Sequence, residues 1–259
     1  MKLEGKRFLV VGAGKSGIAA MGLLKGQGYP VILYDGNGNL EEGELQKKSV
    51  WLQDAEIYLG SLPEEALKRC EIAVLSPGVP TDIPEVERMR RAGLAIWGEI
   101  ELGYAFEQGR VLAITGTNGK TTTTALLGEI MGRHFSHVHV VGNIGIPYTA
   151  MVKDTRPDSV TVAEISSFQL ETVHTFCPQV SAILNITPDH LNRHHTMENY
   201  VAVKERIAEN QTKNDTCVLN YEDPYTKNFG ERCPAKVVYF SSARALEDGL
   251  YLDGEEIYE

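Results

Sequence analysis

The sequence has 259 residues, of which 42% are hydrophobic, so it is long enough to bury one large hydrophobic core or two ordinary ones. Its formal net charge of -10 excludes a general affinity for nucleic acid or for an anionic membrane surface, because both attract basic proteins. Its four cysteines form no CxxC pair, no apolar run approaches the roughly 20 residues that cross a bilayer, and no secretion signal opens the sequence, so we expect a cytoplasmic protein with reduced thiols.

In the first part of the chain, short runs rich in Val, Ile and Leu alternate with stretches of helical spacing. The runs predict strands at Phe8–Val11, Val31–Tyr34, Ile72–Leu75 and Ala95–Trp97, and the stretches predict helices at Ile18–Gln27 and Pro84–Ala92. Such alternation is typical of parallel sheets with helices on both faces. We therefore assign the chain to the α/β class and expect a Rossmann-like domain over residues 1–97.

A glycine-rich loop, Gly12–Gly17, follows the first predicted strand and matches the pattern GxGxxG. Such a loop offers backbone N–H groups and a helix N-terminus to a diphosphate, and Asp35 ends the second strand where dinucleotide folds hold a ribose. The motif alone is weak, because NAD is its default ligand and the glycines can also serve only the close packing of helix on strand. The loop predicts a site for a nucleotide-like diphosphate.

A helical stretch, Glu99–Phe106, leads into a new strand at Val111–Ile114 and opens a second unit of the same alternating kind, over residues 98–259. The chain ends in Leu250–Tyr258, where Asp253-Gly254 predicts a hairpin. Because a hairpin is an unusual place for a domain to stop, we expect this second domain to be incomplete. Its further predicted strands are Val138–Val141, Val160–Ile165, Ala182–Ile186, Cys217–Asn220 and Val237–Phe240.

The residues after Ile114 have the pattern of a phosphate loop, since they lie between a buried strand and a helical run, Thr123–Met131. Glycines let successive N–H groups curl round an anion, Lys120 can reach the β- and γ-phosphates of ATP, and Thr121 can bind Mg²⁺. The usual spacing puts a glycine at position 114, so the match is to a shortened variant; the alternative is a plain turn between strand and helix. The second domain is thus expected to be P-loop ATPase-like with a mostly parallel sheet. The predicted ATP-binding residues are Gly116, Thr117, Asn118, Gly119, Lys120, Thr121 and Thr122.

Two residues at the ends of predicted strands are candidate metal ligands. Glu164 stands in an otherwise apolar strand and needs a partner for its charge; in an ATP site Mg²⁺ suits an oxygen ligand, although backbone donors or an arginine could satisfy the carboxylate instead. His190 lies in a loop at the carboxyl edge of the sheet, where α/β sites collect. A loop histidine is more often solvated, and chemistry alone does not favour His190 over His194 or His195.

Lys204 lies in a predicted helix over Glu198–Asn210 and shares one face with Tyr200, Val203 and Ile207. Burial lowers the pKa of a lysine and yields a neutral amine. Beside a divalent cation, such an amine can take up carbon dioxide as a carbamate and become an anionic metal ligand. The common alternative is that the amine reaches out to water along the apolar surface.

Four segments together resemble the Mur ligase family in order and spacing, and the resemblance covers essentially the whole chain. They are Gly116–Thr122, Gly142–Gly145, Glu164–Glu171 and Asn185–Leu191. The run Ser166–Glu171 (SSFQLE) is similar to that of the member of the family that adds D-glutamate. The resemblance changes the interpretation of the Gly12–Gly17 loop, which then holds the UDP of a UDP-muramoyl substrate in place of NAD.

The resemblance also implies roles for individual residues. Lys120, His190 and Lys204 would be catalytic. Thr121 and Glu164 would bind magnesium, and His190 and a carbamylated Lys204 would bind a second magnesium. The substrate contacts would be Lys15, Ser16, Ser76, Pro77 and Gly78 to the uridine or diphosphate, and Asn143, Ser166 and Gln169 to the muramoyl or alanyl part.

The implied reaction is the ATP-dependent ligation of D-glutamate to UDP-N-acetylmuramoyl-L-alanine through an acyl phosphate, carried out by a monomer in cytoplasmic peptidoglycan precursor synthesis. Family members often have Asp where this chain has Asn192, which leaves the charge at that position in doubt. The family also has a C-terminal domain that binds the incoming amino acid, which we expect to be absent here, so this piece should bind the UDP substrate without completing the ligation alone.

Four alternative functions remain. Two are a sister ligase for another amino acid and a non-catalytic nucleotide-binding module. The other two are a folylpolyglutamate synthetase, which the first domain disfavours, and an NAD-dependent oxidoreductase, which the phosphate loop disfavours.

Overall fold

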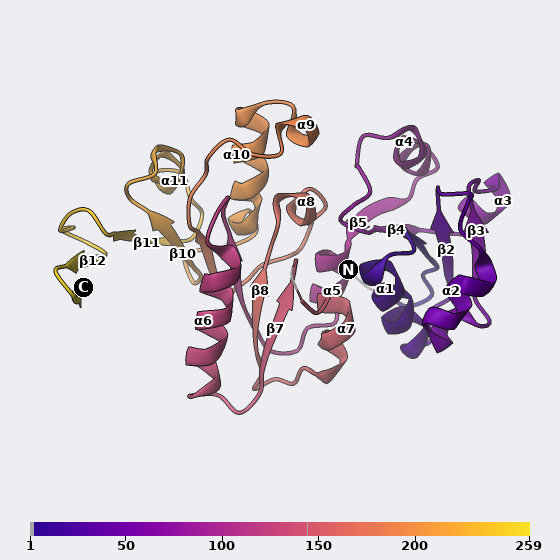
Figure 1. Ribbon diagram of the computed structural model, residues 1–259, viewed down its shortest axis with the longest axis horizontal. Coiled ribbons are helices and arrows are strands. Elements are labelled where there is room, and N and C mark those ends of the chain that lie inside the picture. The colour runs from indigo at the N-terminus through magenta and orange to yellow at the C-terminus, as the bar shows by residue number, and fades with distance from the viewer. Residues whose placement is uncertain (1–2, 144) are drawn as a thin grey trace. The chain divides into compact units, whose positions relative to one another are not determined.

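The computed structural model describes residues 3–143 and 145–259, and Figure 1 shows their helices and strands. The chain divides into two compact units. The first comprises Met1–Phe106, Pro147–Lys153 and Glu171–His174, and the second comprises Glu107–Ile146, Asp154–Leu170 and Thr175–Glu259. Each is a layered α/β structure, which confirms the predicted class. The domain boundary between residues 97 and 98 stays a prediction.

The first unit is built on a parallel sheet of five strands in the order β3-β2-β1-β4-β5. The order reverses at β1, whose neighbours are β2 and β4, so the loop after β1 lies at the switch point where open α/β sheets bind ligands. Both β1 and β4 are buried along their whole length. The strands are β1 (Phe8–Val11), β2 (Val31–Asp35), β3 (Glu56–Leu59), β4 (Ile72–Leu75) and β5 (Ala95–Gly98).

The helices of the first unit cover this sheet, and Val86 and Met89 of α4 join Leu9, Ile32 and Leu75 in one buried cluster. The helix predicted from Ile18 begins earlier, so Lys15 and Ser16 belong to the first turn of α1. The helical segments are α1 (Lys15–Gly26), α2 (Glu42–Lys48), α3 (Glu64–Leu67), α4 (Pro84–Arg91), α5 (Glu99–Tyr104) and α7 (Tyr148–Met151), with 3-10 turns η1 (Val50–Leu52) and η2 (Val152–Asp154).

A buried carboxyl group ties α7 to α5 within the first unit. Glu99 Oε1 accepts hydrogen bonds from the backbone N and the Oγ1 of Thr149, at 2.7 and 2.8 Å. Burial raises the pKa of Glu99, while these hydrogen bonds act in the opposite direction. The segment around α7 therefore packs with the first unit although it follows the second unit's strands in sequence.

The second unit is built on an eight-stranded sheet in the order β13-β12-β11-β10-β9-β6-β8-β7. Strands β6 to β12 pair in parallel, and β13 pairs antiparallel with β12, which confirms the hairpin predicted at Asp253-Gly254. The strands are β6 (Arg110–Thr115), β7 (Val138–Gly142), β8 (Val160–Glu164), β9 (Val180–Ile183), β10 (Thr216–Asn220), β11 (Lys236–Ser241), β12 (Leu250–Asp253) and β13 (Glu256–Tyr258).

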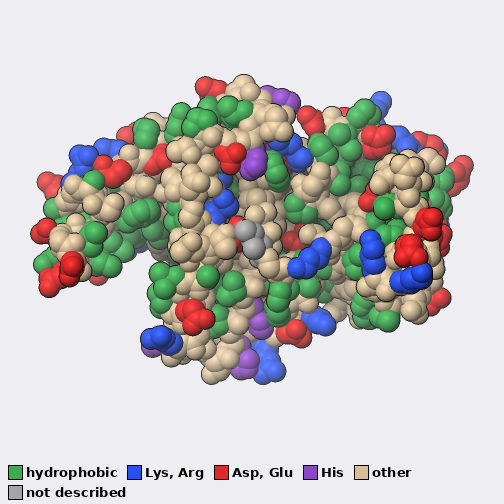
Figure 2. Space-filling view, viewed as in Figure 1, with side chains coloured by type: hydrophobic (Ala, Val, Ile, Leu, Met, Phe, Trp, Pro, Cys, Tyr) green, Lys and Arg blue, Asp and Glu red, His purple; other side chains and the backbone are tan. Residues whose placement is uncertain are grey.

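One face of this second sheet packs on α6 (Lys120–Gly132), whose Leu127 and Met131 lie against a buried cluster that includes Ile114 and Val162. The opposite face carries fully buried side chains such as Cys217 and Leu219. Figure 2 shows hydrophobic side chains exposed around α6, where an apolar hollow of about 480 Å³ opens beside the helix. The other helical segments of this unit are α8 (Ser167–Leu170), α9 (Leu191–His194), α10 (Met197–Glu205), η3 (Arg206–Ala208) and α11 (Pro224–Gly230).

Two further findings concern helix length and the state of the thiols. Among the residues that the structure describes, no helix combines the length and the apolar character needed to cross a bilayer. The cysteines, Cys70, Cys177, Cys217 and Cys233, are all free. Burial raises the pKa of Cys70 to about 11, so this thiol stays protonated at neutral pH.

Candidate functional site

The loop between β6 and α6 has the geometry of a phosphate loop. Gly116 and Gly119 have φ angles of 152° and 82°, which favour glycine, and a Cβ atom at Gly116 would lie 3.1 Å from that of Leu184. Because α6 begins at Lys120, the free N–H groups of its first turn follow the loop directly. Lys120 Nζ donates to the carbonyl oxygen of Thr117 at 2.9 Å. A helix N-terminus and a cation therefore lie together at this loop.

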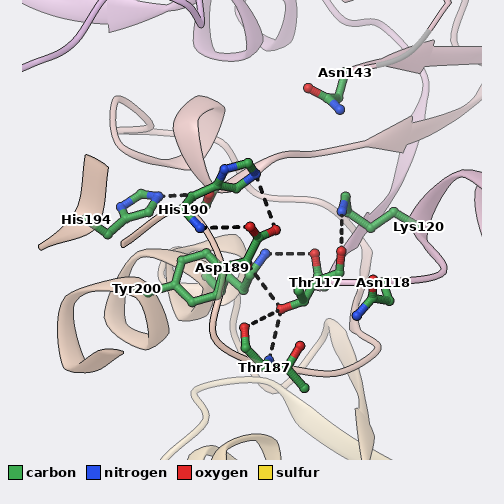
Figure 3. A network of polar contacts seen from close by, with 12 residues as sticks. Thr117, Asn118, Lys120, Asn143, Thr187, Asp189, His190, His194 and Tyr200 are labelled. Atoms are coloured by element: carbon green, nitrogen blue, oxygen red, sulfur yellow. Dashed lines mark hydrogen bonds and ion pairs between the residues drawn. The ribbon is translucent and has the colours of Figure 1, made fainter. Parts of the chain in front are cut away.

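Residues just after β9 hold the phosphate loop from one side. The carbonyl oxygen of Asn185 accepts from the backbone N of Thr117 at 2.9 Å, and its Oδ1 accepts from the backbone N of Asn118 at 2.8 Å. The Oγ1 of Thr117 accepts from the backbone N of Thr187 at 3.0 Å and lies 3.1 Å from the hydroxyl oxygen of Tyr200 (Figure 3). Sequence reasoning missed these loop-holding roles of Asn185, Thr187 and Tyr200. The position of Asn185 at a strand end was the available signal.

Lys204 is buried, with 1% of its surface exposed, and its Nζ donates to the carbonyl oxygen of Gly116 at 2.8 Å. Burial first, and then the positive charge of Lys120, lower the pKa of Lys204 to about 7, while the charge of Asp189 acts in the opposite direction. Of the two alternatives for Lys204, a buried amine and one that extends to water, the structure shows the buried one. A large fraction of its amine is therefore neutral at pH 7.

Glu164 ends β8 between two neighbouring strands, in register with Ile114 of β6 and with Gly142 of β7. Its side chain is 2% exposed, and its Oε1 accepts from Nδ2 of Asn143 at 3.2 Å. A Cβ atom at Gly142 would lie 2.0 Å from the carbonyl oxygen of Glu164, so only glycine permits this approach. The phosphate loop, Glu164 and Asn143 thus lie at the ends of three adjacent parallel strands.

His190 is the residue just before α9, at its N-cap position, and its side chain is 50% exposed. Its Nε2 lies 3.4 Å from Oδ2 of Asp189. Within residues 3–143 and 145–259, no three His, Cys, Asp or Glu side chains gather as a metal site. Mg²⁺ needs no such cluster, because it uses one or two carboxylates and completes its shell with water and phosphate oxygens. Glu164 beside the phosphate loop fits that requirement, and the joint role of His190 and Lys204 stays a prediction.

The remaining predicted residues of the second unit lie on two helix starts. Thr121 and Thr122 are exposed in the first turn of α6. Ser166 and Gln169 are bonded to each other at α8, where Oε1 of Gln169 accepts from the backbone N and the Oγ of Ser166 at 2.9 and 3.0 Å. Gln169 is 3% exposed, so its side chain is fixed. Contact of these residues with magnesium or substrate stays a prediction.

The Gly12–Gly17 loop of the first unit is closed mainly by its own backbone. A Cβ atom at Gly17 would lie 1.8 Å from the carbonyl oxygen of Gly12, so α1 packs directly on the loop. Ser76 Oγ donates to the same carbonyl oxygen at 3.3 Å. Oδ2 of Asp35 accepts from the backbone N of Ala13 at 2.7 Å, so this carboxylate holds the loop itself, a role that sequence reasoning missed.

The predicted UDP contacts lie at the carboxyl ends of the adjacent strands β1 and β4. Lys15 is exposed and Ser16 half-buried in the first turn of α1, whereas Ser76 and Pro77 are half-buried and Gly78 exposed after β4. These positions are those of a ligand site at a switch point. Their contact with a nucleotide stays a prediction.

Fold and loops together define a class of protein, in which a Rossmann-like unit with a glycine loop precedes an α/β unit with a phosphate loop. Residues 6–98 match the N-terminal domain of MurD-like Mur ligases, and residues 114–253 match the Mur ligase middle domain. The chain belongs to the Mur ligase family.

Similar relatives carry the name UDP-N-acetylmuramoylalanine–D-glutamate ligase. That of Lachnoclostridium phytofermentans is 57% identical over 97% of this chain and 56% of its own length, and that of Clostridioides difficile is 43% identical over 99% and 57%. The chain spans a little over half the length of these curated relatives. The solved UDP-N-acetylmuramate:L-alanyl-gamma-D-glutamyl-meso-diaminopimelate ligase of Neisseria meningitides has a TM-score of 0.62 at 15% identity and covers 95% of this chain and 80% of its own, which supports the fold alone.

Proposed function

We propose that the protein is an ATP-dependent ligase that joins D-glutamate to UDP-N-acetylmuramoyl-L-alanine, as a monomer in cytoplasmic peptidoglycan precursor synthesis. The names of the relatives support the choice of substrates. The main structural support for ATP-dependent chemistry is the register of β6 and β8, in which Ile114, just before the phosphate loop, is paired with Glu164. A loop for phosphate and a buried carboxylate at neighbouring strand ends suit a magnesium-bound nucleotide.

Residues Gly116 to Thr122 would bind the phosphates of ATP through loop and helix N–H groups, with Lys120 at the β- and γ-phosphates. Thr121 and Glu164 are the oxygen ligands proposed for one Mg²⁺ ion. Magnesium held there would neutralise charge on the phosphates and polarise the transferred phosphoryl group. Lys120 would stabilise the negative charge that moves onto ADP as it leaves.

A second magnesium is proposed at His190 and a carbamylated Lys204. The neutral amine that a pKa of about 7 provides can attack carbon dioxide, form an N–C bond and release one proton to solvent. The buried cation thereby becomes a carboxylate-like anion. The 2.8 Å contact of Nζ with Gly116 of the phosphate loop supports a position close to the nucleotide.

The UDP substrate would bind in the first unit, with its diphosphate at the N-terminus of α1 beside Lys15 and Ser16 and its uridine near Ser76, Pro77 and Gly78. The muramoyl and alanyl groups would then meet Asn143, Ser166 and Gln169. The hydrogen bond between Asn143 and Glu164 supports this, because it joins a proposed substrate contact to a proposed metal ligand.

In the proposed reaction the alanyl carboxylate attacks the γ-phosphorus of ATP, the bond to the bridging oxygen breaks, and ADP leaves. The amine of D-glutamate then attacks the acyl phosphate, loses a proton and displaces inorganic phosphate. The products are the amide, ADP and phosphate. The role of the protein is to hold the two substrates in line and to neutralise charge.

Calorimetric titration of the 259-residue chain with three ligands tests the substrate assignment. UDP-N-acetylmuramoyl-L-alanine should bind most tightly, UDP-N-acetylmuramic acid more weakly and NAD not measurably, because the proposed site reads the UDP-muramoyl-alanyl group. Micromolar binding of NAD with no binding of either UDP ligand would overturn the proposal.

A further inference from the structure

The short helix α9 is flanked on both sides by residues with strained backbone. His190 has φ 51° and the residue after α9, His195, has φ 67°; among the described residues they are the two non-glycine residues with positive φ. Histidine adopts positive φ more readily than most residues, but positive φ is uncommon in residues other than glycine. Such conformations persist only where the surroundings impose them, and they gather at functional sites. Something must hold α9 in place.

The buried residue of α9 is His194, which is 4% exposed, whereas Leu191 and His195 are exposed. Nε2 of His194 lies 2.9 Å from Oγ of Ser167 on α8. Its ring is stacked on Phe168, with centroids 5.5 Å apart, and lies 5.2 Å from the ring of Tyr200 on α10. The side chain of His194 thus links α9 to both neighbouring helices, beside the contact of Arg193 with Phe168 and the hydrogen bond from Asn199 Nδ2 to the carbonyl oxygen of His194.

Phe168, which packs on His194, also packs on His190. The ring of Phe168 is 4.9 Å from the ring of His190, so Phe168 contacts both histidines. Figure 3 shows His194 and Tyr200 beside Asp189 and His190. The backbone N of His194 also donates to the carbonyl oxygen of His190 at 3.1 Å, which closes the single turn between them. Displacing His194 would therefore release His190 from its present position.

We propose that His194 is a positioning residue, which holds α9 through Ser167 and Phe168 and so keeps the imidazole of His190 beside Asp189. The inference rests on the proposed function, in which His190 binds magnesium. His194 itself is buried against α8 and α10 and acts only through His190.

Nuclear magnetic resonance of the histidine-labelled chain tests this inference through two properties of His190. Without metal, the ring-current shift of the His190 signals reports the distance to Phe168. With Mn²⁺ and a non-hydrolysable ATP analogue, paramagnetic broadening of the same signals reports closeness to the metal. Single substitutions at each of the 7 histidines provide the assignments.

Two variants separate the contacts of His194. His194→Phe keeps the stacked ring and loses the hydrogen bond to Ser167, whereas His194→Gln keeps a polar group and loses the ring. Both should move the His190 signals toward their solvent-exposed positions and reduce the broadening several-fold. Ser167→Ala removes only the hydrogen-bond partner and should do the same to a smaller extent. The matched control is His195→Asn, because asparagine also tolerates positive φ, and it should leave both readouts unchanged.

The outcomes are distinguishable. If all three variants keep the ring-current shift and the broadening of the unaltered chain while their amide spectra remain folded, the positioning role is wrong. If the unaltered chain shows no broadening at His190, the proposed metal role of His190 fails, and the ring-current shifts still decide whether His194 positions it. If His194→Phe or His194→Gln does not fold, Ser167→Ala carries the test alone.

Discussion

Each unit of this protein has a glycine-rich loop after a buried strand, β1 or β6, and before the next helix, and the two loops differ in what surrounds them. The Gly12–Gly17 loop is held by the packing of α1 on Gly12 and by the carboxylate of Asp35, which accepts a hydrogen bond from the backbone N of Ala13. The phosphate loop after β6 is held by the buried Lys204, which donates to the carbonyl oxygen of Gly116, and by Asn185, whose backbone carbonyl and side-chain Oδ1 each accept from a backbone N–H of the loop.

On the proposed function, the difference would let one local geometry serve two ligands. Strand, glycine loop and helix N-terminus give each unit a place for phosphate. Two buried or half-buried lysines and a neighbouring carboxylate then suit the second loop to a triphosphate with magnesium, whereas the first loop offers the exposed Lys15 at the start of α1. Fold supplies the anion site, and side chains from adjacent strands select the chemistry.

The largest effect is expected at Lys204. In a chain extended to the length of its relatives, Lys204→Ala should lower ligase activity by about 100-fold, because it removes a proposed metal ligand. Added bicarbonate or a small carboxylate should restore part of the activity, since a diffusible anion can replace a lost carboxylate but not a lost ammonium group. Steady-state rates with and without acetate provide the measurement. Full activity of the alanine variant would remove Lys204 from the site.

Lys120→Ala tests whether ATP binds at the second loop and not at the first. Losing a cation that bonds to phosphate should weaken ATP binding by at least about 1.5 kcal/mol, roughly tenfold, and leave the UDP ligand unaffected. Calorimetry on the 259-residue chain measures both affinities. Unchanged ATP affinity would mean that the loop after β6 is not the nucleotide site.

The low pKa of Lys204 predicts a pH dependence of stability in the metal-free chain. Between its folded pKa of about 7 and its ordinary value of 10.5, the unfolded state binds a proton that the folded state does not. The unfolding free energy should therefore rise with pH across this window, by about 1.4 kcal/mol per pH unit at most, and the penalty should be fully present below pH 7. Hydrogen exchange of the backbone amides in β6 and β9 reports the unfolding free energy of the second unit. Lys204→Met should remove most of the rise; an unchanged rise in this variant would contradict the assignment.

Asp35→Asn should have the smallest effect and should be confined to the first loop. The amide offers one acceptor where the carboxylate accepts from both Ala13 and Asn37, so the first unit should lose about 1 kcal/mol. Both tryptophans, Trp51 and Trp97, lie in the first unit, so their fluorescence during urea unfolding reports on it alone. A change in ATP affinity would show that the loops are not independent.

Much of the fold could be predicted from the sequence because its central strands are continuous apolar runs. β1 and β4 are buried on both faces and were predicted at Phe8–Val11 and Ile72–Leu75. β3 was missed because Glu56–Leu59 is a short edge strand, half-buried throughout. The joining of Pro147–Lys153 and Glu171–His174 to the first unit could not be predicted, because it depends on contacts between residues far apart in sequence.

Some features of the candidate site could likewise be predicted from the sequence, and others could not. The phosphate loop and the burial of Lys204 follow from local patterns, a glycine spacing and a helical stripe. The roles of Asn185 and Tyr200 do not, since each is defined by a partner about 70 or more residues away in sequence. Asp35 was placed correctly at a strand end, but the backbone of Ala13 uses its carboxylate, and no local pattern reveals that.

A calorimetric titration with both ligands in turn tests directly whether the two loops bind different ligands at the same time. UDP-N-acetylmuramoyl-L-alanine is added to the chain already saturated with magnesium and a non-hydrolysable ATP analogue, and the experiment is repeated with Lys120→Ala. We expect one UDP ligand and one nucleotide per chain, bound together, with the substitution weakening only the binding of the nucleotide. Displacement of either ligand by the other, or loss of both in the variant, would contradict this expectation.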